Sequence, residues 1–209
     1  NATLSGVNIL RNVIGIQCED TCNARITSPT VEACVTGMSL EGASRTNMTG
    51  AIIFGSSTTG ISITESGTKA FIDGSQIDGL ISATNTGNGV IVSGGATASL
   101  NGCSIESCVN ALTVGVSVSD TSTTIAECQG IAIHNGNTNH IAQNGTSTLR
   151  FVGGSFNGSP SKLSINDATN VSFAAYDENN DDVLALGKFS DVDQDLIQIE
   201  DGTTDTQKL

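Results

Sequence analysis

The sequence is short of several residue types on which common folds depend. It has no Trp, one Tyr and six Phe among 209 residues, and aromatic residues make up 3% of the chain. A β-sandwich needs large side chains to fill the space between its sheets, so that fold is not favoured. Strong helix formers such as Lys, Arg and Leu are scarce before the last segment, whereas Gly, Ser, Thr, Val and Ile are common. The composition therefore predicts an all-β chain.

Basic residues are also few. Four Lys and four Arg stand against 21 Asp and Glu, which gives a formal net charge of −13. Because phosphate neutralisation needs clustered basic residues, we expect neither nucleic acid nor an anionic membrane as a partner. No apolar run approaches the roughly 20 residues of a membrane span, and no signal peptide is visible. The chain opens at Asn1, for which a cleaved secretion signal and a trimmed fragment are equally good explanations.

One short phrase, a small residue followed by alternating apolar and small or polar residues, recurs along the chain. Gly89-Val90-Ile91-Val92 is a typical copy, and copies begin at residues 15, 37, 60, 89, 111, 130 and 162. Alternation with a period of two, broken by Gly, Ser, Asn or Asp, predicts short strands and turns. A repeat of roughly 20 to 30 residues predicts a solenoid. Leu is too sparse for a leucine-rich repeat, so we predict a parallel β-helix of about seven or eight coils, each with two or three strands.

On this coil pattern, from Gly15 to Ser172, the chain resembles the right-handed parallel β-helix superfamily, the pectate-lyase-like group. The resemblance implies a right-handed solenoid, and the group includes polysaccharide lyases, glycosidases, phage tailspikes, adhesins and passive surface proteins. Polygalacturonase-like hydrolases resemble one another in Asn-Thr-Asp, Asp-Asp, Gly-His-Gly and Arg-Ile-Lys segments. Here Asn85-Thr86-Gly87 lacks the Asp, and Asp181-Asp182 lies outside the coils. The expectation is therefore a non-catalytic member.

The strongest catalytic candidates are Asp73 and Asp78, two carboxylates inside the coils that are five residues apart in sequence. Two carboxylates can serve as acid and base in glycoside hydrolysis. Pectate lyases, however, also need a basic Arg, and none is near this pair. Neither His134 nor His140 is close in sequence to a pair of cysteines, and there is no C-x2-C spacing for zinc. We predict no enzyme, no metal and no cofactor.

The six cysteines provide evidence about the redox state of the compartment in which the protein works. The even number suits disulfides in an oxidising compartment, and reduced thiols used as small apolar core residues are the alternative. Three of them lie two or three residues before a predicted coil start, so we expect these three on equivalent rungs, the last two on adjacent ones. The three are Cys34, Cys108 and Cys128, and all the disulfide candidates are Cys18, Cys22, Cys34, Cys103, Cys108 and Cys128.

The C-terminal segment differs in composition from the rest. We predict a β-helix over residues 1–176 and an acidic, hairpin-like extension over residues 177–209, which caps the last coil or pairs with another subunit. Longer loops, where solenoids place binding function, are predicted near 79–88 and 141–161. Sequons for N-glycosylation are no more frequent than chance allows, so glycosylation is left open at Asn1, Asn47, Asn144, Asn157 and Asn170.

Three candidate functions fit a polar, acidic rod. The first is a structural subunit of an extracellular assembly, a filament, sheath or surface layer, in which copies of the β-helix pack head to tail. The alternative is an adhesin or a virion fibre or tailspike-type module that recognises a glycan or receptor. A polysaccharide lyase or hydrolase is the third and least favoured. The expected location is extracellular or at a cell surface, with the virion surface as the alternative.

Overall fold

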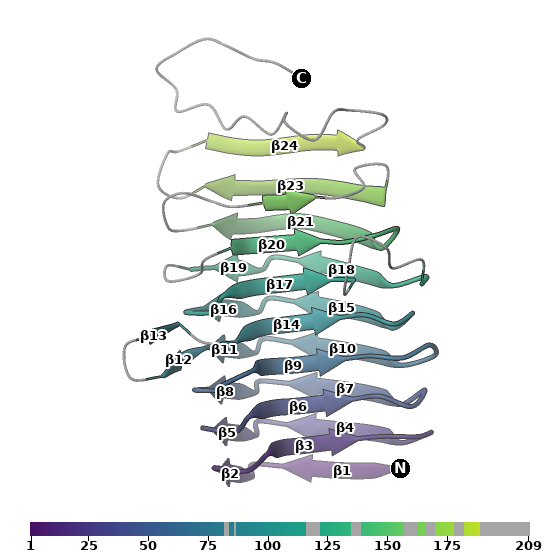
Figure 1. Ribbon diagram of the computed structural model, residues 1–209, viewed down its shortest axis with the longest axis vertical. Helices are drawn as coiled ribbons and strands as arrows, with labels where there is room; N and C mark the ends of the chain where they lie inside the picture. The colour runs from purple at the N-terminus through teal and green to yellow at the C-terminus, as the bar shows by residue number, and fades with distance from the viewer. Residues whose placement is uncertain are drawn as a thin grey trace.

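The computed structural model describes residues 1–81, 84–85, 87–115, 122–134, 139–156, 163–165, 170–177 and 182–188. Short strands stack in parallel into a tall column, with the N-terminus at one end and β24 near the other (Figure 1). Three ladders of strands run along the column, and each turn of the chain contributes a strand to each ladder. This arrangement is a parallel β-helix, as the repeat predicted.

The first ladder is a seven-stranded parallel sheet. Its strands carry the repeated phrase, and their order along the sheet follows their order along the chain. They are β3 (Ile14–Cys18), β6 (Thr36–Leu40), β9 (Thr59–Ile63), β14 (Asn88–Val92), β17 (Asn110–Val114), β20 (Asn139–Gln143) and β22 (Leu163–Ile165).

The second and third ladders meet through the long strand β21 and so count as one 15-stranded sheet. The second ladder comprises β1 (Ala2–Ser5), β4 (Asn23–Thr27), β7 (Arg45–Thr49), β10 (Lys69–Asp73), β15 (Thr97–Asn101), β18 (Ile125–Gln129), β21 (Thr148–Phe156) and β23 (Val171–Asp177). The third comprises β2 (Asn8–Leu10), β5 (Thr30–Glu32), β8 (Ile52–Phe54), β11 (Gln76–Asp78), β16 (Ser104–Glu106), β19 (Ala132–Ile133) and the end of β21.

Five of the seven predicted coil starts lie in strands of the first ladder, and the phrase that begins at residue 162 continues into a sixth, β22 (Leu163–Ile165), whereas the start at Gly130 is wrong. Gly130 is the positive-φ corner between β18 and β19, and the strand after it belongs to the third ladder. The first-ladder strand of that coil is instead β20, in which Ile141 pairs with Leu112. Here His140 stands where the earlier coils have Gly or Ala. The phrase at Gly130 resembles a coil start because strands of the first and third ladders both come after a small residue and both alternate apolar residues with small or polar ones.

The interior of the column is a stack of aliphatic side chains. In each five-residue strand of the second ladder the second and fourth residues point inward, and the register stacks Met48, Ile72 and Leu100 on successive coils. Among the side chains that the structure describes, Phe151 is the one fully buried aromatic. The interior is narrow enough for one aliphatic side chain from each inward position to fill it. The chain can therefore form a core with few aromatic residues.

A single residue with positive φ turns the chain from the second ladder into the third. This conformation costs glycine little because it has no Cβ, and it makes a sharp corner in one residue. The seven corner residues have φ between 49° and 65° and are Gly6, Ser28, Gly50, Gly74, Gly102, Gly130 and Gly153.

A second set of glycines stands at the coil starts, where a larger residue would not fit. A Cβ atom added to Gly15, Gly37, Gly60 or Gly89 would lie 2.4–2.6 Å from a buried aliphatic side chain and from the carbonyl oxygen of the next coil. Contacts under 3.0 Å to backbone cannot be relieved without moving the ladder. The small residue that opens the repeated phrase is therefore set by packing between coils.

Two features depart from the regular coils. A short antiparallel hairpin of β12 (Leu80–Ile81) and β13 (Thr84–Asn85) projects from the column, where the first longer loop was predicted (Figure 1). At the other end β24 (Asp182–Lys188) pairs antiparallel with β23, as expected of a hairpin-like extension. The predicted loop at 141–161 is wrong over most of its length, since β20 and β21 occupy 139–143 and 148–156. Residues 189–209 lie outside the described residues.

Candidate functional site

The outward face of the second ladder is the best-formed surface for a ligand. The first, third and fifth residues of each five-residue strand point to solvent, as alternation requires. The third residues form one line along the rod and the fifth residues another. In register, the third-residue line runs Arg25, Asn47, Phe71, Ser99, Glu127 and Arg150, and the fifth-residue line runs Thr27, Thr49, Asp73, Asn101, Gln129 and Val152.

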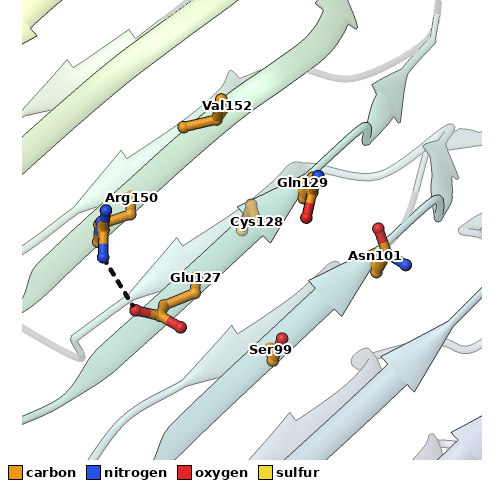
Figure 2. A pocket seen from close by; sticks show the side chains of 7 residues that line it. All are labelled: Ser99, Asn101, Glu127, Cys128, Gln129, Arg150 and Val152. Carbon is orange, nitrogen blue, oxygen red and sulfur yellow. Dashed lines mark hydrogen bonds and ion pairs between the residues drawn. The ribbon is translucent and has the colours of Figure 1, made fainter.

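Two clefts lie on this face. The larger, of about 440 Å³, is shown in Figure 2, and the smaller is of about 260 Å³. Both include Ser99 and Asn101, so the two are continuous across β7, β10, β15, β18 and β21. Ser99 is a small residue between Phe71 and Glu127 in register, which accounts for the hollow there. We call this continuous depression the outer groove.

The outer groove is lined mainly by hydroxyl, amide and charged groups. Asn101 donates from Nδ2 to Asp73 Oδ1 at 3.0 Å. Arg150 and Glu127 form an ion pair at 3.4 Å in which both side chains are more than half exposed, so it adds little to stability (Figure 2). Groups held on the surface by neighbouring strands can donate to and accept from the hydroxyls of a ligand.

One aromatic ring stands at the end of the groove nearer the N-terminus. Phe71 is 39% exposed on β10, and the guanidinium carbon of Arg45 lies 5.2 Å from its ring centroid. That distance is within the range of a cation–π contact. An exposed ring on a strand is a rigid apolar platform beside the polar wall of the groove.

The structure separates the two carboxylates that the sequence put forward as acid and base. Asp73 lies in the outer groove at the end of β10, whereas Asp78 ends β11 on the third ladder. The register places Asp78 beside Glu106 instead, and Glu106 accepts from Gln76 Nε2 at 3.1 Å. Neither Asp78 nor Glu106 lines one of the two clefts.

The described part of the chain contains no group of side chains that could bind a metal ion. No three His, Cys, Asp or Glu side chains come together there in a way that could hold an ion. His134 and His140 both fall in described segments, at the end of the third-ladder strand β19 and inside β20. No described helix is long and apolar enough to cross a membrane.

All six cysteines are free thiols in the structure, and five are buried. Cys34 and Cys108 occupy equivalent corners, since their sulfurs lie 3.3 and 3.2 Å from where a Cβ of Gly15 and Gly89 would be. They are three coils apart, about 14 Å at about 4.8 Å per coil, which is too far for a disulfide. The prediction that Cys128 shares this corner is wrong, because it lies in β18 between Leu100 and Phe151.

Two pairs of cysteines do lie close together. Cys18 ends β3 and Cys22 precedes β4, and their side chains interact across the turn between these strands. Cys103 lies near enough to Cys128 to contribute to raising its pKa, after the larger effect of burial. Disulfide formation stays a prediction, and the two pairs that the structure brings close are Cys18 with Cys22 and Cys103 with Cys128.

Reduced protein is expected to react with iodoacetamide at Cys22 first. The thiolate is the nucleophile, and burial raises the pKa of Cys108 to about 12 and also raises the pKa values of Cys18, Cys103 and Cys128. At pH 8 a thiol with a pKa of 12 is thiolate in only about one molecule in 10⁴. Raising the pH towards 12 should therefore increase labelling of Cys108. Cys22 is only partly buried.

Mass spectrometry of the labelled peptides measures this order directly. We expect about one label per native chain, and labelling of all six cysteines in urea. In the Cys22→Ser variant the fast label should disappear. Labelling of Cys108 or Cys128 as fast as Cys22 would contradict the buried column.

Sequence reasoning missed the outer groove because its members on successive coils are 23 to 28 residues apart along the chain. Thr49, Asp73, Asn101 and Gln129 each immediately precede a corner glycine. That glycine is the signal which aligns them: once Gly50, Gly74, Gly102 and Gly130 are matched as corners, the residue before each falls in one line. The coil-start phrase alone aligns the first ladder, on a different side of the rod.

Comparison with known proteins identifies the fold and nothing narrower. A family model described as right handed beta helix region matches residues 1–77. No curated protein and no solved structure matches the chain. The family match covers the coils from β1 to β11, and the same three ladders continue beyond it.

Proposed function

We propose that this right-handed parallel β-helix protein is a non-enzymatic binding module, located outside the cell or at a cell surface, which holds an extended glycan in its outer groove. The single observation that carries the proposal is the continuity of the groove along one side of the rod. A run of hydroxyl, amide and charged groups with one exposed ring at its end suits a chain of sugar rings more than a compact ligand.

Both carboxylates that line the described groove have a side-chain partner, which supports binding without cleavage. Asp73 is engaged by Asn101, and Glu127 by Arg150. Each of these two carboxylates is therefore engaged by a neighbouring side chain of the groove, and neither is held towards a second carboxylate as an acid–base pair would be. The groove is open and shallow, so it does not exclude water from a reacting bond.

Binding to immobilised glycans, followed by calorimetry on those that bind, tests the proposal. Replacing Phe71 by Ala is expected to weaken binding on the order of tenfold, because stacking on an aromatic face contributes about 1 kcal/mol. The matched control is Ile52→Ala, which removes an apolar side chain of similar exposure, 45%, from the third ladder. No binding to any glycan, or equal effects of the two variants, would overturn the proposal.

A structural subunit that packs head to tail is the second candidate. Strands β1, β2 and β3 stand at the ends of their ladders, so one side of each has no described partner strand. Leu4 and Ile9 are only partly buried against the core there, and Leu10 and Val13 are 56% and 73% exposed. An apolar end with open strand edges suits addition of further coils.

Electron microscopy of the purified chain at neutral pH distinguishes this candidate from the first. Filaments or sheets with a repeat along the rod would support head-to-tail packing. Single rods at all concentrations would reject it and leave the binding module. Replacing Val13 by Lys should reduce any assembly, since it places a charge at the open edge, whereas Val109→Lys, at the equivalent corner far from that edge, should not.

A further inference from the structure

Three basic side chains gather beside one end of the outer groove. Arg25 is the third residue of β4, and Arg45 and Lys69 are the first residues of β7 and β10. All three are exposed. Arg45 is paired in register with Lys69, and Arg25 with Asn47, so the three occupy neighbouring strands. We call Arg25, Arg45 and Lys69 the basic cluster.

The basic cluster is unusual in a chain with a formal net charge of −13. It holds three of the eight Lys and Arg residues. Arg150 lies on the same face but is paired with Glu127, whereas no described carboxylate lies within 4.0 Å of the three cluster residues. The positive charge of the cluster is therefore available to a ligand.

The pairing of Arg45 with Lys69 also works against folding. Neighbouring strands are about 4.8 Å apart, and like charges directly opposite each other destabilise a sheet. Acidic residues are abundant in this chain, yet neither position of this cross-strand pair carries one. An arrangement that costs stability and leaves charge unpaired indicates a negatively charged partner from outside.

The cluster and the groove are physically joined. The Arg45 guanidinium lies over the Phe71 ring, and Phe71 and Asn47 both line the smaller cleft. A ligand that occupies this cleft therefore reaches the cluster without leaving the surface. The guanidinium groups present paired N–H donors that match the two oxygens of a carboxylate or sulfate.

We infer that the basic cluster binds the carboxylate or sulfate groups of an acidic glycan whose sugar rings lie in the outer groove. The inference rests on the proposed function and narrows its ligand class. Ring stacking on Phe71 and hydrogen bonding to Asn47 and Asn101 supply the neutral contacts. Arg25, Arg45 and Lys69 supply selectivity for charge at the end nearer the N-terminus.

Calorimetry of the full chain with three hexasaccharides tests the inference: one neutral glucose oligomer, one of galacturonic acid and one sulfated. At least one acidic hexasaccharide should bind on the order of tenfold more tightly than the neutral one, and the difference should shrink as salt is raised. Arg45→Gln should lose that preference. Arg11→Gln, which removes one exposed positive charge from the corner after β2, should keep it.

The possible outcomes distinguish selectivity for acidic glycans from glycan binding itself. Equal binding of neutral and acidic hexasaccharides would overturn the inference and leave glycan binding intact. Binding of none, together with a negative glycan array, would overturn both. Binding of a poly-glutamate peptide or a single-stranded oligonucleotide as tightly as the acidic hexasaccharide would reject a glycan site in favour of a general anion surface. Preference for an acidic hexasaccharide that Arg45→Gln abolishes and Phe71→Ala weakens would support both.

Discussion

The Gly37→Val variant is expected to lose about 3 kcal/mol or more of folding free energy. A Cβ at Gly37 would lie 2.5 Å from the carbonyl oxygen of Gly60 and 2.5 Å from Cγ2 of Ile53. The oxygen is backbone in the next coil and Ile53 is fully buried, so neither can move without opening the column. Valine adds further carbon atoms to the same crowded space.

Urea denaturation followed by circular dichroism measures the loss as a lower midpoint. The matched control is Gly102→Asn. Nothing lies within 4 Å of a Cβ at Gly102, and Asn tolerates the positive φ of 57° found there. We expect the control to lose about 1 kcal/mol or less. Equal midpoints for the two variants would show that the coil-start column is not packed as described.

The Phe151→Ala variant is expected to lose about 3 to 5 kcal/mol. Phe151 is the largest fully buried side chain among those that the structure describes, with Cys128 next to it in register and Gly154 against its ring. A Cβ at Gly154 would clash with Cε1 of the ring, so the glycine fits the ring closely. Removing the ring leaves a cavity in a column that has no other layer to collapse onto it.

Phe71→Ala is the control for this prediction, because it is the same chemical change on the outside of the same ladder. With 39% of its surface already exposed, Phe71 should cost about 1 kcal/mol or less when truncated. Thermal unfolding of the two variants side by side gives the comparison. Equal losses would mean that the interior near Phe151 is looser than a close-packed core.

Much of the fold could be predicted because each copy of the repeat is encoded by residues that are adjacent in sequence. A small residue, then alternating apolar residues, marks a strand of the first ladder in six of seven places. Gly130 misled because a corner glycine followed by Ile131 looks like a coil start, and His140 hid the true start. Both errors come from one fact: in this fold glycine serves at coil starts for lack of space and at corners for its positive φ, and a sequence does not distinguish the two reasons.

Sequence reasoning missed the outer groove for a different reason. Its shape depends on which residue of one coil lies above which residue of the next, and a shift by one residue turns an outward side chain inward. The register of Phe71, Ser99 and Glu127 is fixed only when every corner is assigned. A chain with few aromatic residues can still offer a platform for a sugar ring, because one exposed ring in the right line, Phe71, is enough.

The uniform register between coils gives this rod a property of its own. Because each coil touches only the coil before and the coil after it, whole coils are interchangeable units, and insertion or loss of one leaves the two new interfaces chemically like the old. The length of the outer groove then grows by one strand with every coil added. Duplication of one coil, about 22 to 28 residues of sequence, would thus change how many sugar units the surface spans without redesigning a core.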